Sequence, residues 1–144
     1  MVDQPRWPLE GVKVLDLGQI YNGPYAGFLL AHAGADVVKV EPLDGEVLRK
    51  RGGGLGAPFS LTMLNTNKRG ISIDLKNPDG KQLLIDLVKE ADILLENFAP
   101  GAMDRLGLGS DVLLHENPRL IYGSSTGYGL SGPDRDNLAM DLTV

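Results

Sequence analysis

Residues 12–41, VKVLDLGQIYNGPYAGFLLAHAGADVVKVE, constrain the fold of this chain more than any other stretch. They read as an apolar run, a break at Pro24, apolar residues at helical spacing over 25–33, and a second apolar run that closes on Glu41. Short continuous apolar runs are typical of strands buried on both faces of a parallel sheet. Proline suits the first position of a helix, and Gly34 is well placed to end this one. The pattern predicts a βαβ unit, which usually holds its ligand at the carboxyl ends of its strands.

Strand and helix patterns alternate along the rest of the chain as well. Asn77 and Pro78 predict a helix start, with asparagine as the cap and proline at the first position. Ser110 is expected to cap a later helix. The segment 43–58 carries five glycines and predicts a long mobile connection, either functional or simply solvated. The predicted helices are 59–67, 78–90, 102–105 and 110–116, and the further predicted strands are 71–74, 92–96 and 120–122.

This alternation predicts an α/β fold with a Rossmann-like, doubly wound and mainly parallel sheet. The length favours a single domain over 1–144, and an apolar fraction of 42% is sufficient for a real core. From residue 124 the chain is rich in glycine and turn formers, and it stops just as 138–144 begins to look apolar and regular. A complete domain seldom ends in this way. We therefore expect a domain that is truncated at its carboxy terminus.

Composition and charge exclude several classes of function. No apolar run approaches the roughly 20 residues of a membrane helix, and the start of the chain lacks the pattern of a secretory signal, so we expect a cytoplasmic protein. The absence of cysteine excludes disulfides, thiolate zinc sites and cysteine nucleophiles. A net charge of −5, with no basic block beyond 49–51, argues against nucleic-acid binding. His32 and His115 fall on separate predicted helices, which gives a metal site little support.

Three glycines in the first turn and helix invite a dinucleotide interpretation. Gly18, Gly23 and Gly27 are spaced G-x4-G-x3-G, however, and the fingerprint that brings backbone to a pyrophosphate is G-x-G-x-x-G. We interpret these glycines as serving tight packing and turn geometry instead.

Polar and aromatic residues follow the strand predicted at 92–96. Asn97, Phe98 and Arg105 offer an amide, an aromatic face and a guanidinium at a strand end, which suits an adenine-phosphate ligand. The alternative places Phe98 in the core and pairs Arg105 with Asp104 or a neighbour. Lys68, Arg69 and Lys76 flank the third strand, and taken alone they are expected to be solvated charges.

Several longer motifs occur in one order along the chain. They are PLEGVKVLD (8–16), GP (23–24), GADVVKVE (34–41), NKR (67–69), DLK (74–76), DILLENFAPG (92–101), NPRLIY (117–122) and GYG (127–129). Over essentially its whole length the chain resembles the amino-terminal part of the class III CoA-transferase family. Formyl-CoA and carnitine CoA-transferases and the 2-methylacyl-CoA racemases belong to that family.

The resemblance implies an enzyme of acyl-CoA metabolism, with coenzyme A as co-substrate and no metal. Family members transfer CoA from a thioester to a free carboxylic acid through an acyl anhydride and an aspartyl-CoA thioester. They are interlocked homodimers. The nucleophilic aspartate of the family aligns beyond Val144, so the chain alone is expected to have little or no transferase activity. Asp16, Asp74 and Asp141 are not expected to replace it.

The resemblance also implies a set of CoA-binding residues. They are Ile20, Ile73, Asn97, Phe98 and Arg105, with Arg105 near the phosphates, Lys76 as a weaker phosphate candidate, Tyr21 beside Ile20 at the thioester end, and Asp141 at the site entrance. Pro42 and Ala139 stand where formyl-CoA transferases carry basic residues, which puts oxalate or formate specificity in doubt.

Two alternatives to a transferase stay open. One is a non-catalytic fragment or subunit that binds CoA. The other is a 2-methylacyl-CoA racemase, which is disfavoured because racemases of the family carry a catalytic histidine directly before the aspartate, where this chain has Met140.

Overall fold

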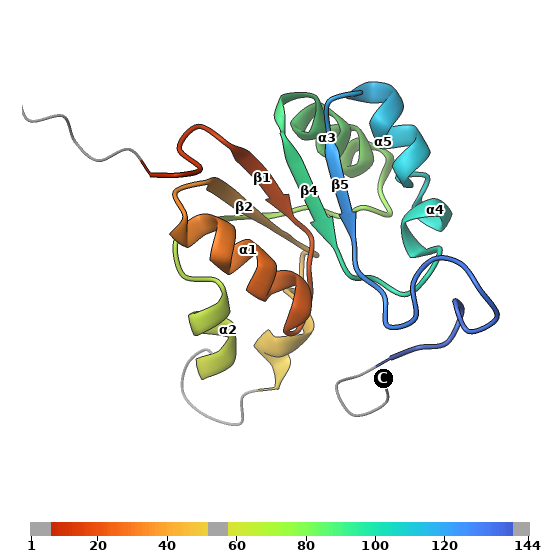
Figure 1. Ribbon diagram of the computed structural model, residues 1–144, viewed down its shortest axis with the longest axis horizontal. Coiled ribbons are helices and arrows are strands. Elements are labelled where there is room, and N and C mark those ends of the chain that lie inside the picture. Colours follow the sequence, from red (N-terminus) through yellow and green to blue (C-terminus); the bar gives the residue numbers. More distant parts are fainter. Residues whose placement is uncertain (1–6, 52–57, 140–144) are drawn as a thin grey trace, which may run out of the picture.

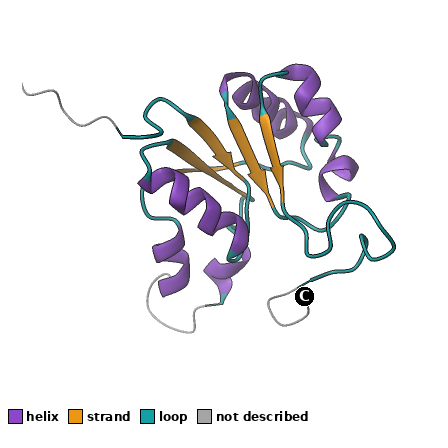
Figure 2. Cartoon of the chain, in the orientation of Figure 1, coloured by secondary structure: helices purple, strands orange, loops and turns teal. Residues whose placement is uncertain are grey.

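The computed structural model describes residues 7–51 and 58–139. They form one five-stranded sheet in the order β3-β2-β1-β4-β5, in which every described pairing is parallel (Figures 1 and 2). This is the strand order of a doubly wound sheet, so the expected fold class is confirmed. Among the described residues, no helix is long and apolar enough to cross a membrane. The strands are β1 (Lys13–Asp16), β2 (Asp36–Glu41), β3 (Lys68–Ser72), β4 (Ile93–Glu96) and β5 (Ile121–Ser124). The helices are α1 (Asn22–His32), the 3-10 helix η1 (Val47–Lys50), α2 (Phe59–Leu64), α3 (Pro78–Glu90), α4 (Ala102–Leu106) and α5 (Ser110–Glu116).

Two apolar cores lie on opposite faces of the sheet. Successive side chains of a strand point to opposite faces, so Val14 and Leu15 of β1 enter different cores. Val14 packs with Val37 and with Ala31 of α1. Leu15 belongs to the larger core, which α3, α4 and α5 cover with Leu84, Val88, Met103 and Leu113. The central strands are therefore buried on both sides, as their continuous apolar runs predict.

Several predicted element boundaries are confirmed. α3 runs from Pro78 to Glu90, and the Asn77 side chain caps it by accepting a hydrogen bond from the Asp79 backbone N–H at 2.9 Å. Gly34 ends α1 with φ +100°, a backbone conformation that disfavours residues with a Cβ.

Other boundaries differ from the prediction; α2, for example, ends at Leu64 rather than at residue 67. α1 begins at Asn22, so Pro24 is its third residue, where its missing N–H still leaves no helical bond unmade. β3 starts at Lys68 rather than Ile71, because pairing with Val37 of β2 extends it over residues without an apolar pattern. Ser110 is the first residue of α5 and its side chain forms no cap.

The expected long mobile connection is wrong for the described residues 43–51. They contain η1, which begins directly after Glu46, and both Glu46 and Leu48 are buried. Residues 52–57 lie outside the described part. Residues 43–51 bring charged side chains back to the ends of β1 and β2.

Candidate functional site at the carboxyl ends of the strands

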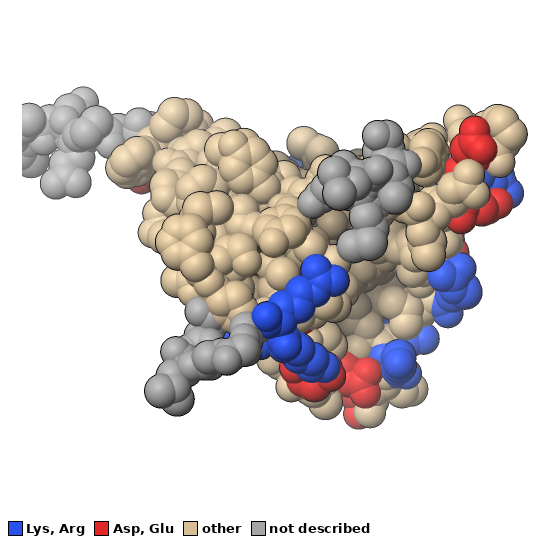
Figure 3. All heavy atoms as spheres, turned by 90° about the horizontal axis from the view of Figure 1, so that it is seen from below, with Lys and Arg blue, Asp and Glu red and all other residues tan. Residues whose placement is uncertain are grey.

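The segments that follow β1, β2, β3 and β4 meet at one edge of the sheet and enclose a hollow of about 210 Å³. Figure 3 views the molecule from this side, where basic and acidic side chains gather. Doubly wound sheets bind ligands at such strand ends. The apolar wall includes Leu17, Val40, Ile73, Phe98 and Leu106, and the charged side chains that contribute include Glu41, Glu46 and Lys76.

The loop after β1 is held against this hollow by a side chain that follows β4. Asn97 uses both ends of its amide on one backbone unit: its Oδ1 accepts from the Gln19 N–H at 2.6 Å, and its Nδ2 donates to the Gln19 carbonyl at 2.9 Å. The next residue, Ile20, has φ +63°. A β-branched residue is strained there and persists only where its surroundings fix it. The Ile20 N–H donates to Glu46 Oε2 at 3.0 Å, which supplies part of that constraint.

A cluster of buried charges lies beneath the same loop. Asp16 is fully buried at the end of β1, and its Oδ2 pairs with Lys68 Nζ at 2.7 Å. Lys39 Nζ lies 3.8 Å from Asp16 Oδ1 and donates to the Gly18 carbonyl. Burial lowers the pKa of both lysines, and the Asp16 carboxylate opposes this shift. The prediction that Lys68 is a solvated charge is therefore wrong, whereas Arg69 is exposed and pairs with Asp36.

Glu41 ends β2 in a second charged contact. Its carboxylate accepts hydrogen bonds from Nε and Nη2 of Arg49, at 2.6 and 2.7 Å. It also accepts one from the Glu46 backbone N–H, at 3.0 Å. The Arg49 hydrogen bonds lower the pKa of Glu41, with the Glu46 N–H adding to the shift and burial opposing it. Glu41 thereby anchors the start of η1 and places Glu46 in the hollow.

The glycines of the first turn and of α1 serve close packing, as expected. A Cβ on Gly18 would lie 2.6 Å from the Gly23 Cα, because the turn closes on itself at these two residues. A Cβ on Gly27 would lie 2.7 Å from Asp16 Oδ2, so this glycine lets α1 approach the buried carboxylate. These close contacts explain why glycine occupies positions 18, 23 and 27.

The residues expected to bind CoA do not all occupy the same position. Ile73, Lys76 and Phe98 line the hollow, whereas Ile20 and Asn97 support the loop beside it. Two further residues expected to bind CoA are exposed: Tyr21 at the start of α1 and Arg105 on α4. Asp141, the last of the expected residues, lies outside the described part of the chain.

The alternative paired Arg105 with Asp104 or a neighbour, but Arg105 forms no ion pair with a carboxylate among the described residues. Its Nη1 donates a long hydrogen bond of 3.3 Å to the Pro100 carbonyl. Phe98 is partly buried against the larger core, so it belongs both to the core and to the hollow.

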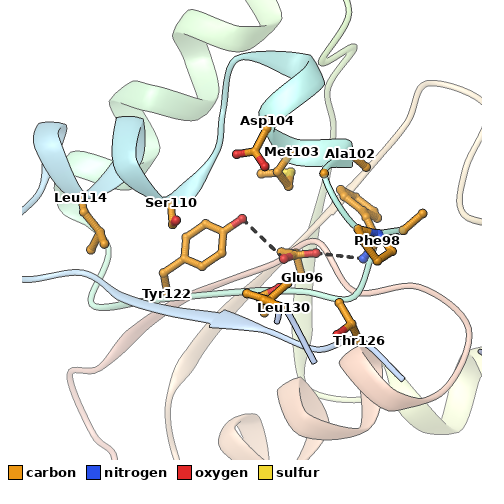
Figure 4. A pocket seen from close by; sticks show the side chains of 14 residues that line it. Glu96, Phe98, Ala102, Met103, Asp104, Ser110, Leu114, Tyr122, Thr126 and Leu130 are labelled. Carbon is orange, nitrogen blue, oxygen red and sulfur yellow. Dashed lines mark hydrogen bonds between the residues drawn. The ribbon is translucent and has the colours of Figure 1, made fainter. Parts of the chain in front are cut away.

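A second hollow, of about 320 Å³, lies between β4, β5, α4 and α5 (Figure 4). The buried Glu96 stands at its base, where its Oε2 accepts from the Phe98 N–H at 2.8 Å and its Oε1 from the Tyr122 hydroxyl at 3.5 Å. Burial, together with Glu96 and Asp104, raises the pKa of Tyr122. Thr126 lines this hollow and a third one of about 440 Å³, and Phe98 lines all three.

The positions of Glu46, Glu96 and Tyr122 in these hollows are not evident from the sequence. Glu46 falls in a glycine-rich stretch that predicts a mobile loop, so nothing in the pattern marks it as buried. Glu96 and Tyr122 belong to predicted strands, but only the pairing of β4 with β5 brings their side chains together.

A family model described as CoA-transferase family III matches residues 9–144. A protein of Streptomyces avermitilis named formyl-CoA:oxalate CoA-transferase is 43% identical over 138 residues, which cover 94% of this chain and 34% of that protein. A protein of Chloroflexus aurantiacus named succinyl-CoA--L-malate CoA-transferase beta subunit is 42% identical over 132 residues, which cover 90% of this chain and 33% of that protein.

Solved structures give the same picture. A CAIB/BAIF family protein from Brucella suis superposes with a TM-score of 0.89 and 38% identity, covering 94% of this chain and 38% of the other. A hypothetical protein from Mycobacterium tuberculosis gives a TM-score of 0.86 and 39% identity, with coverage of 97% and 38%. The chain thus spans about a third of the length of the curated relatives it matches.

Proposed function

This chain belongs to CoA-transferase family III, and on that premise we propose that it forms the CoA-binding part of an enzyme that moves CoA from an acyl-CoA thioester to a carboxylic acid. The observation that carries the proposal is the hollow at the strand ends. It joins an apolar wall, including Ile73 and Phe98, to the cation of Lys76 within one small volume. Pockets for small molecules commonly combine apolar walls with a few polar groups in this way.

The donor set of the site fits the chemistry of CoA. An apolar slot of about 210 Å³ suits a flat base, and Phe98 supplies the aromatic face. Phosphates require cations, and the exposed Arg105 and Lys76 form no ion pair among the described residues. A guanidinium can hold a phosphate through two parallel hydrogen bonds, so we assign Arg105 to the phosphates. Ile20 and Tyr21 are assigned to the thioester end.

We place the nucleophile outside this chain. In the proposed reaction an aspartate carboxylate attacks the thioester carbonyl, which forms an acyl anhydride and releases the CoA thiolate. The thiolate attacks the aspartyl carbonyl of the anhydride, releases the donor acid as its carboxylate and leaves an aspartyl-CoA thioester. The acceptor carboxylate repeats these two steps in reverse order, which gives the new acyl-CoA and regenerates the aspartate. Asp16 is unsuited to this role because it is fully buried and paired with Lys68. Asp74 is committed to the turn before α3, where its Oδ1 accepts from the Lys76 N–H at 2.9 Å. The homodimer and the cytoplasmic location stay predictions.

Titration calorimetry of the 144-residue chain with CoA tests the proposal. We expect saturable binding by the wild type and at least about tenfold weaker binding by Arg105→Ala, since a charge-assisted phosphate contact is lost. Arg119→Ala is the matched control, because Arg119 is an exposed arginine just before β5, at the opposite edge of the sheet. The chain alone should not exchange CoA between acids. No heat with wild type, or equal loss in both variants, would refute the CoA site.

A further inference from the structure

The outer surface of α1 and α2 exposes several large apolar side chains. On α1, Tyr25 and Leu29 are 51% and 49% exposed, and on α2, Phe59 and Met63 are 82% and 43% exposed. Tyr25 and Leu29 lie four residues apart, so their side chains share one face of the helix. Exposed apolar side chains are ordinary when they occur singly, but these four lie on two helices that contact each other. They form one surface, which we call the α1–α2 patch.

One buried side chain joins the two helices of the patch. Lys68 Nζ donates to the Pro24 carbonyl of α1 at 2.8 Å and to Oδ1 of Asn65, directly after α2, at 3.1 Å. Its third partner is the buried carboxylate of Asp16. The helices are therefore fixed relative to each other, and a partner that binds to them has little backbone to order.

Charged side chains are absent from both helices of the patch. No Asp, Glu, Lys or Arg occurs in residues 21–33 or 58–66, although 23% of the chain is charged. The part of the molecule that α1 and α2 occupy accordingly shows a broad area without charged side chains, at the left of Figure 3. Copies of a chain with a net charge of −5 repel each other, so they meet at the least electrostatic cost through an uncharged surface.

We propose that the α1–α2 patch is the contact surface between two copies of this chain. Together with the exposed Tyr21, its four side chains present about 500 Å² of mainly apolar surface. A stable interface takes about 800 Å² from each partner, and in homodimers about 65% of that area is apolar. The patch therefore has the area of the apolar part of such an interface, and the exposed polar residues beside it, among them Asn22 and Thr62, supply the rim.

The spacing along α1 also suits a contact with its own copy. Tyr21, Tyr25 and Leu29 are each four residues apart and form one exposed ridge. Ridges of this spacing on two helices interdigitate when the helices cross at about −50°. This contact needs only helices of the present chain, so it differs from the interlocking of chains that the family resemblance implies.

Sedimentation equilibrium of the 144-residue chain tests the proposal. At about 100 μM the wild type should have twice the 15.5 kDa mass of one chain, since interfaces of this size have micromolar or tighter dissociation constants. Leu29→Glu should raise the dissociation constant of the dimer at least about a hundredfold, because each copy would bury an unpaired carboxylate. Phe59→Ser should raise it at least about tenfold through the loss of apolar area.

Leu83→Glu is the matched control, because Leu83 is a 44% exposed leucine of α3, on the opposite face of the sheet. It should leave the dissociation constant unchanged. A monomeric wild type at about 100 μM, or equal weakening of the dimer by Leu29→Glu and Leu83→Glu, would overturn the proposal. Phe59 is largely exposed within one chain, so Phe59→Ser keeps the test decisive even if Leu29→Glu fails to fold.

Discussion

Replacing Lys68 by methionine should destabilise the fold far more than the same change at its neighbour Arg69. Lys68 Nζ contacts Asp16 Oδ2 at 2.7 Å, the Pro24 carbonyl at 2.8 Å and Asn65 Oδ1 at 3.1 Å, and its side chain is 1% exposed. Methionine keeps most of the volume and removes the ammonium group. Removal of one partner from a buried ion pair destabilises by about 3–5 kcal/mol because the other charge is left buried.

The structure places Lys68→Met near the lower end of that range. Asp16 would keep a hydrogen bond from the Gly18 N–H at 2.8 Å and the Lys39 ammonium at 3.8 Å. We therefore expect a loss of about 3 kcal/mol. With an m value of about 2 kcal/mol/M, the midpoint of urea unfolding should fall by about 1.5 M.

Arg69→Met is the control for this experiment. Arg69 pairs with Asp36 at 2.6 Å, but both side chains are largely exposed, and surface pairs of this kind contribute about 0–1 kcal/mol. The assay is urea unfolding of the wild type and both variants, followed by circular dichroism at neutral pH. Equal midpoints for the two variants would refute the argument that Lys68 neutralises a buried carboxylate.

Two further changes test the loop and the end of β2. Asn97→Ala removes both hydrogen bonds to the Gln19 backbone, at 2.6 and 2.9 Å, and should lower the free energy of unfolding by about 2–4 kcal/mol. An unchanged stability together with a lost affinity for CoA would instead show that Asn97 contacts the ligand directly. The pKa of Glu41 is lowered in the folded state, so its stabilisation is present above its ordinary value of 4.5 and is lost as pH falls through the lowered pKa. Glu41→Gln should therefore be about 1 kcal/mol less stable at pH 7, since Arg49 is half exposed, and the difference from wild type in urea unfolding should shrink below pH 4.5. A difference that grows on acidification would contradict this sign.

The sheet follows from the sequence because its signals are local. The apolar runs around Val14 and Val37 each mark a strand buried on both faces, and Asn77-Pro78 marks the start of α3 within two residues. The fold class can therefore be predicted without knowledge of any contact between distant residues. The start of β3 was missed because residues 68–70 become a strand only through pairing with β2.

The candidate site was only partly predictable. Phe98 and Lys76 follow strands, so their place at the strand ends follows from topology alone. Asn97 has the same position, yet both ends of its amide are engaged by Gln19, 78 residues earlier in the chain. Spacing along the chain cannot separate a ligand contact from a contact that supports a loop. Lys68 and Glu46 were misjudged for the same reason, since their burial depends on partners 52 and 26 residues away.

The loop after β1 joins the stability of this fold to its proposed binding site. Its backbone is held by Asn97 from the end of β4, by Glu46 from the connection after β2, and by Lys39 from β2 itself. Each of these three side chains is buried or partly buried, and the strained Ile20 conformation depends on them together. Such a loop is preorganised, because the strain is compensated during folding and not when the ligand arrives. Substitution of any of these three residues should therefore lower both the stability of the fold and the affinity for CoA, whereas substitution of the exposed Arg105 should lower the affinity alone.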